Sequence, residues 1–69
     1  MEKFICKTNC KLGQFKDDVK EGQEFPVLRN IQNECVLIRA ENNKPNIICK
    51  ERQLRKYGAL TGTPVLGGI

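Results

Sequence analysis

The chain has 69 residues, a mass of 7.9 kDa and a formal net charge of +4, with 39% hydrophobic and 29% charged residues. This is the composition of one small folded domain whose core contributes roughly 3–5 kcal/mol, and it argues against an enzyme with a deep cleft. The sequence contains no run of 18 apolar residues and no apolar secretory segment, which predicts a non-enzymatic cytoplasmic protein without membrane contact.

Short apolar runs separated by turn residues predict a mostly β domain. The first run, Lys3–Lys11, opens with β-favouring side chains and predicts a strand. The next segment, Leu12–Glu21, lacks a helical stripe and predicts a long loop that Phe15 or Val19 pins to the core. A second strand is expected at Glu24–Ile31, after a turn that contains glycine.

The second half of the chain predicts two more strands, at Cys35–Ala40 and Asn46–Lys50, each joined to its predecessor as a hairpin. Glu51–Leu54 is one helical turn long, so we expect a single 3₁₀ turn that places Leu54 in the core. A last short strand is expected at Arg55–Leu60. This order is that of a small SH3-like barrel of about five strands with one short 3₁₀ turn.

Three segments resemble a known group of proteins. The strand that carries Cys6, the segment Lys20–Leu28 and the segment Ile47–Leu54 are similar to small SH3-like proteins encoded by bacteriophages and prophages of low-GC Gram-positive bacteria. The resemblance implies a binding protein, with no catalytic residue or cofactor, that binds and modulates a host macromolecule. The expected partner is a host protein.

The positive charge is uneven along the chain. Residues 1–34 carry six basic and six acidic side chains, whereas residues 35–69 carry six basic and two acidic ones. The densest basic segment, Lys50–Lys56, predicts a surface for an acidic protein or, alternatively, for the phosphates of a nucleic acid. A solvated turn without a binding role is the plainer alternative. The partner-binding residues predicted here are Lys50, Arg52, Arg55 and Lys56.

Four cysteines occur at Cys6, Cys10, Cys35 and Cys49, in a chain without histidine. Neither close pair has the C-x₂-C spacing of a structural zinc site. A cysteine in an apolar strand behaves as a small core residue. We therefore expect buried free thiols, no metal and no cofactor; a zinc site and a disulfide are the alternatives.

The C-terminal residues 61–69 follow the predicted barrel of residues 1–60 as a tail. Residues 59–69 contain no charged side chain, yet Leu60, Val65, Leu66 and Ile69 are apolar. Flexible tails are normally polar. The tail is therefore expected to pack over an open face of its own barrel or to join a partner, including a second copy in a homodimer.

Overall fold

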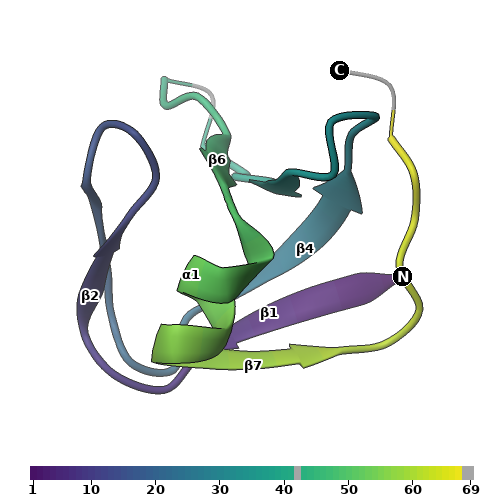
Figure 1. The fold of residues 1–69 in the computed structure, drawn as a ribbon. Coiled ribbons are helices and arrows are strands. Elements are labelled where there is room, and N and C mark those ends of the chain that lie inside the picture. The colour runs from purple at the N-terminus through teal and green to yellow at the C-terminus, as the bar shows by residue number, and fades with distance from the viewer. Residues whose placement is uncertain (42, 68–69) are drawn as a thin grey trace.

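A computed structural model describes residues 1–41 and 43–67, and the fold is mostly β, as predicted. Figure 1 shows a strongly curved sheet with a hairpin and one short helix beside it. In chain order the elements are β1 (Glu2–Cys6), β2 (Cys10–Leu12), β3 (Asp17–Val19), β4 (Glu24–Arg29), β5 (Cys35–Leu37), β6 (Ile47–Cys49), α1 (Glu51–Tyr57) and β7 (Gly58–Thr61).

Five of the strands form one antiparallel sheet in the order β6-β5-β4-β1-β7. The strands β2 and β3 pair only with each other, as a separate hairpin. Across the described part of the chain the edge strands β6 and β7 do not pair. The sheet is therefore open and is not a closed barrel.

The core fills the space between the sheet, the hairpin and the helix. Alternate side chains of β1 point inward, and the hairpin contributes Leu12 and Val19, which are at most 1% exposed. Leu54 is fully buried, as predicted. Each such side chain stabilises the fold by about 1.5–3 kcal/mol. The core cluster consists of Phe4, Cys6, Leu12, Val19, Val27, Cys35, Leu37, Ile47, Cys49 and Leu54.

The first half of the chain differs from the prediction. The strand expected at Lys3–Lys11 ends at Cys6, and the loop expected at Leu12–Glu21 contains the second strand of a hairpin. The hairpin forms because Leu12 and Val19 both reach the core, while a four-residue turn that includes Gly13, with φ of +80°, lies between the strands. Strands β4, β5 and β6 lie inside the ranges expected for them, and each is shorter than expected.

The expected 3₁₀ turn is wrong: α1 is an α-helix of seven residues, and the last strand begins at Gly58 instead of Arg55. The helix continues because its residues are good helix formers and because Arg55 pairs with Glu51 one turn earlier. It ends at Gly58, where an added Cβ would lie 2.1 Å from the carbonyl oxygen of Ile5. Only glycine allows β7 to pack this closely on β1.

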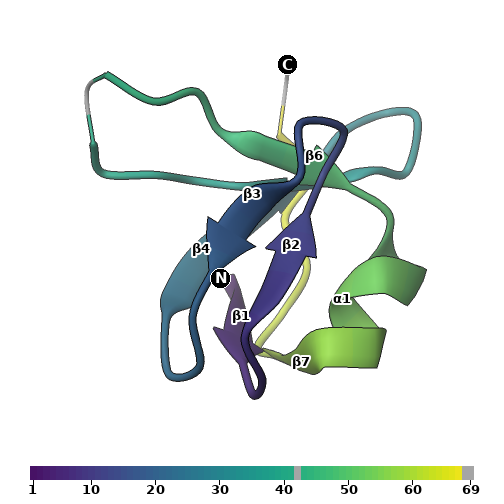
Figure 2. The same cartoon turned by 90° about the vertical axis from the view of Figure 1, so that its left-hand side faces the viewer.

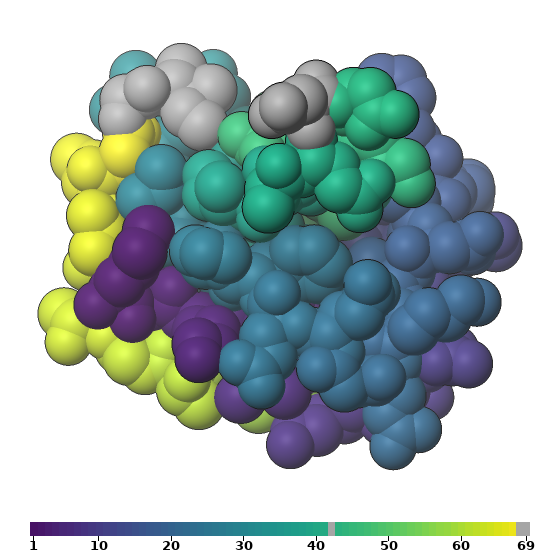
Figure 3. Space-filling view, turned by 180° about the vertical axis from the view of Figure 1, so that it is seen from behind, coloured from purple at the N-terminus to yellow at the C-terminus, as the bar shows by residue number. Residues whose placement is uncertain are grey.

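The tail folds back onto its own chain. The Arg29 N–H donates to the Val65 carbonyl at 2.8 Å, and the Gly67 N–H donates to the Arg29 carbonyl at 2.6 Å. Glu2, the first residue of β1, pairs with Val27 of β4. Beyond this pair β4 has no partner in β1, and the tail lies beside Arg29 instead. Figure 3 shows the yellow tail bordering the purple start of the chain. The predicted apolar contact of Ile69 lies outside the described residues.

Candidate functional site

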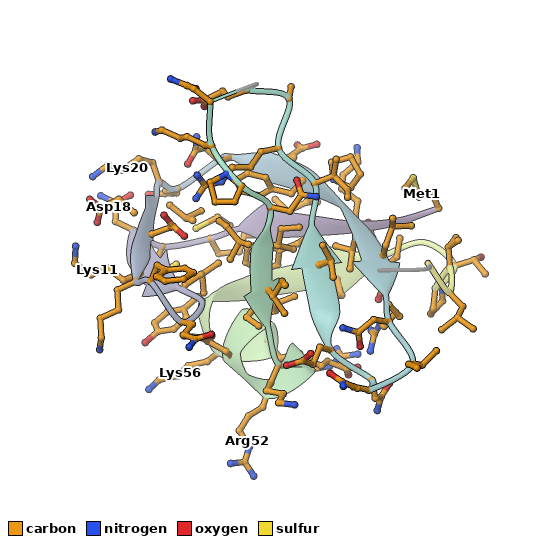
Figure 4. The ribbon with its side chains drawn as sticks, turned by 90° about the horizontal axis from the view of Figure 1, so that it is seen from above. Met1, Lys11, Asp18, Lys20, Arg52 and Lys56 are labelled. Atoms are coloured by element: carbon orange, nitrogen blue, oxygen red, sulfur yellow. The ribbon has the colours of Figure 1, made fainter. Side chains whose placement is uncertain are left out.

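The predicted binding residues lie on helix α1 or directly before it. Arg52 and Lys56 are one helical turn apart and exposed, and both project away from the molecule in Figure 4. The other two have partners: Lys50 lies 3.6 Å from a carboxylate oxygen of Glu34. The Nε of Arg55 donates to Glu51 at 2.6 Å. The structure therefore leaves two of the four predicted cations free of a carboxylate partner among the described residues.

Arg55 belongs to a network of ion pairs centred on Arg29. The Arg29 guanidinium donates to both carboxylate oxygens of Glu2, at 2.9 and 2.8 Å, and also to Glu51. The Arg29 side chain is 13% exposed and that of Glu2 is 4% exposed. Hydrogen bonds from Arg29 and then Arg55 lower the pKa of Glu51, while those to Glu2 and Glu51 raise the pKa of Arg29. The network joins β1, β4 and α1, and its charges cancel.

The uncompensated charge lies elsewhere. Seven of the twelve cations have a carboxylate within 4 Å, and among the described residues Glu21 is the one carboxylate with no such partner. The five remaining cations together with Glu21 account for the formal net charge of +4. These cations are Lys7, Lys16, Lys20, Arg52 and Lys56.

All five free cations come from the hairpin, its flanking loops and α1. The hairpin and the helix lie side by side in Figure 2, and the Gln53 side chain links them through the Gly13 N–H and the Lys11 carbonyl, at 3.4 and 3.5 Å. The Lys7 N–H donates to the Tyr57 carbonyl at 2.9 Å, which ties the β1–β2 loop to the end of the helix. We call this surface the hairpin–helix face; it comprises Lys7, Phe15, Lys16, Lys20, Arg52, Lys56 and Tyr57.

An aromatic side chain stands on this face. Phe15, expected to pin a loop to the core, is 80% exposed in the hairpin turn next to Lys16. Leu12 and Val19, on the two strands of the hairpin, reach the core instead, and the turn between them leaves Phe15 in solvent. Tyr57 is partly buried, and the Lys56 ammonium lies 5.4 Å from the centre of its ring. In the sequence, the glycine at position 13 between the apolar Leu12 and Val19 was the turn signal that would have placed Phe15 at the tip.

The four cysteines are free thiols in this structure, and all but Cys10 are buried. Burial raises the pKa of Cys49 to about 12, and burial together with a hydrogen bond to Cys6 raises that of Cys10 to about 11. Cys10 and Cys49 are therefore mostly protonated at neutral pH and lack the lowered pKa of a catalytic thiol. In the described residues, no group of three or more potential ligand side chains could hold a metal ion.

A hollow of about 540 Å³ lies between the tail and the Arg29 network. Its lining includes Leu60 and Val65 as well as the polar Asn30 and Arg55. Within the parts of the chain that the structure describes, no buried side-chain nitrogen or oxygen lacks a hydrogen-bond partner. Because its polar walls are already satisfied, this hollow has no group that demands a ligand.

Comparison with known proteins gives no match: no protein-family model, curated protein or solved structure is similar to this chain. Among residues 1–41 and 43–67, no helix is both long and apolar enough to cross a membrane.

Proposed function

We propose that this chain is a small non-enzymatic binding protein that recognises an acidic surface of another protein through the hairpin–helix face. One observation carries the proposal. The residues that account for the net charge lie on the hairpin, its flanks and α1, and the hairpin turn also exposes Phe15. The cations have no carboxylate partner in the described residues, and the phenyl ring is 80% exposed.

A protein partner fits the mixture of side chains on this face. Protein interfaces combine a buried aromatic anchor with a charged rim, and complementary charge speeds and orients the encounter. Phe15 is suited to the anchor, and Arg52 and Lys56 to the rim. Two carboxylates, Asp18 and Glu21, stand near the cations, and they would repel a uniformly anionic partner but not the mixed surface of a protein.

The strand order supports an SH3-like assignment for the fold. Strand β1 pairs with β4 on one side and with β7 on the other, and the hairpin is inserted between β1 and β4 in the sequence. The meander β4-β5-β6 then leads through a short helix to β7, in the order expected from the sequence. With the resemblance to phage-encoded SH3-like proteins, this favours a host protein as the partner and the bacterial cytoplasm as the location.

Nucleic acid is the second candidate partner. An exposed phenyl ring among free lysines is also the arrangement on which unpaired bases stack, and Tyr57 offers a further ring. Five phosphate contacts on a single strand would lower affinity roughly 100-fold when salt rises from about 50 to about 200 mM. A protein interface built on a buried Phe15 would lose far less.

The test is capture from a Gram-positive bacterial lysate, followed by affinity measurements on the purified captured protein. Arg52→Glu with Lys56→Glu, and separately Phe15→Ser, should each weaken binding at least tenfold. Lys44→Glu is the matched control, because Lys44 forms an exposed pair with Glu41 in the β5–β6 connection. Equal binding by all variants would remove this face as the site. Steep loss with salt, together with binding to an oligothymidylate, would assign the face to nucleic acid instead.

A further inference from the structure

The thiols of Cys6 and Cys10 meet at the junction between the five-stranded sheet and the hairpin. Cys6 is the last residue of β1 and Cys10 is the first residue of β2. Their Sγ atoms are 3.8 Å apart, in contact but not bonded. A disulfide between them requires the sulfurs to approach to roughly 2 Å.

We propose that Cys6 and Cys10 form an intramolecular disulfide by exchange with a small disulfide such as oxidised glutathione, and that this bond restrains the hairpin relative to the sheet. The proposal goes beyond the proposed function, because it concerns a modification and its effect on the hairpin and needs no partner.

Unequal burial assigns the order of the two steps. Cys10 is partly exposed, whereas Cys6 is 1% exposed. The Cys10 sulfur, after losing its proton, attacks one sulfur of oxidised glutathione, and the other half leaves and takes up a proton as reduced glutathione. The Cys6 sulfur then attacks the Cys10 sulfur of the mixed disulfide and releases the second reduced glutathione. Two protein thiols are oxidised and one glutathione disulfide is reduced to two thiols.

The other cysteine pair provides an internal contrast. Cys35 and Cys49 are register partners on β5 and β6, but they are 0% and 6% exposed in the core. A small disulfide cannot reach either sulfur without opening the sheet. The exchange is therefore selective for Cys10, with Cys6 as the resolving thiol.

Hydrogen bonds connect the Cys6–Cys10 junction to the chain that follows the hairpin. The side-chain oxygen of Asn9 accepts the Glu21 N–H at 2.8 Å, which ties the β1–β2 loop to the chain after β3. Backbone bonds join Cys6 to Gln23 and Gly22, at 2.9 and 2.8 Å. A covalent link across residues 6–10 therefore holds both ends of the hairpin.

The experiment equilibrates the protein with oxidised and reduced glutathione, traps the thiols with acid and alkylating agent, and maps the products by mass spectrometry. The expected product has lost two hydrogens and carries a Cys6–Cys10 link, with Cys35 and Cys49 alkylated after unfolding. Cys10→Ser abolishes the link, and Cys35→Ser preserves it. A Cys10–glutathione adduct that never resolves, or no reaction at Cys10, would overturn the proposal.

Amide hydrogen exchange supplies the second readout. In the oxidised protein we expect exchange of the β2 and β3 amides to slow at least threefold, with β5 and β6 unchanged. A crosslink that forms and leaves hairpin exchange unaltered would also overturn the proposal. Since neither readout uses a partner, a failure here is distinct from a failure of the capture experiment that tests the proposed function.

Discussion

The hairpin–helix face and the tail side of the molecule use the same residue types in opposite ways. On the tail side, Arg29 and Glu2 are nearly buried, fully paired and bound into the fold. On the hairpin–helix face, Arg52 and Lys56 are exposed, with no carboxylate partner in the described residues. Charges that are paired and buried cannot contact another molecule. Of these two regions, the hairpin–helix face is therefore the one with charges available for binding.

Helix α1 contains this difference within a few residues. Arg52 and Arg55 are close in sequence, but Arg55 is joined to Glu51 and through it to Arg29. Arg52 has no such bond among the described residues. Local density of positive charge therefore does not identify a binding site by itself. What decides is whether a carboxylate already satisfies each cation.

The largest effect is expected on the tail side, from Arg29→Met. The substitution leaves the Glu2 carboxylate buried without its cation, which should lower the free energy of unfolding by about 3–5 kcal/mol. Urea denaturation measures it. Lys3→Met is the control, because the exposed pair of Lys3 with Glu24 contributes about 1 kcal/mol or less. Equal stability of the two variants would mean that the Arg29 network does not hold the fold.

Replacing Arg52 and Lys56 by Glu tests whether the hairpin–helix face serves binding while the tail side serves stability. Binding of the captured partner should weaken at least tenfold, or by about 1.4 kcal/mol or more, because an acidic surface repels the reversed charges. Stability should stay within about 0.5 kcal/mol. Arg55→Glu, measured beside it by thermal unfolding, should instead destabilise the fold, since it places like charge beside Glu51. Loss of stability in the Arg52 and Lys56 variant, with normal stability in Arg55→Glu, would contradict these roles.

Removal of residues 63–69 tests the tail. The truncation deletes the two backbone hydrogen bonds to Arg29 and should cost about 1–2 kcal/mol of stability, or a fall in Tm of several degrees. Light scattering on the same samples examines the homodimer predicted from the sequence: loss of a dimer on truncation would show that the tail joins two copies. Unchanged Tm and unchanged size would contradict any structural role for the tail.

The smallest effect is expected when stability is measured at falling pH. Hydrogen bonds from Arg29 and Arg55 lower the pKa of Glu51 from 4.5, so its stabilising effect is present above about pH 4.5 and is lost as the pH falls through the lower folded value. Urea midpoints measured between about pH 6 and about pH 3 should fall less in Glu51→Gln than in the wild type. Glu21→Gln should behave as the wild type, because Glu21 has no cationic partner in the described chain. Identical curves for Glu51→Gln and the wild type would contradict this role.

Much of the fold was predictable from the sequence because strands β4, β5 and β6 are short apolar runs with turn residues at both ends. The hairpin was missed because each of its strands has three residues, too few for an alternation to stand out. Helix α1 was underestimated because its stability depends on the pair of Glu51 with Arg55 and on Gly58 packing against β1.

The candidate site was predictable only in part. Arg52 and Lys56 lie in the basic segment that the sequence singled out, but Lys7, Lys16 and Lys20 are distant in sequence and join them through the fold. Pairing across the chain, such as that of Lys50 with Glu34, leaves no mark in local composition. The cations without a carboxylate partner can be identified only when the ion pairs of the folded chain are known.

The most direct test is an amide NMR titration of isotope-labelled protein with the captured partner. If the hairpin–helix face is the binding surface, the largest shifts and broadening should fall on Lys7, Phe15, Lys16, Lys20, Arg52 and Lys56, with Val65 and Leu66 in the tail unaffected. Changes concentrated in the tail, with the hairpin and α1 unmoved, would contradict it.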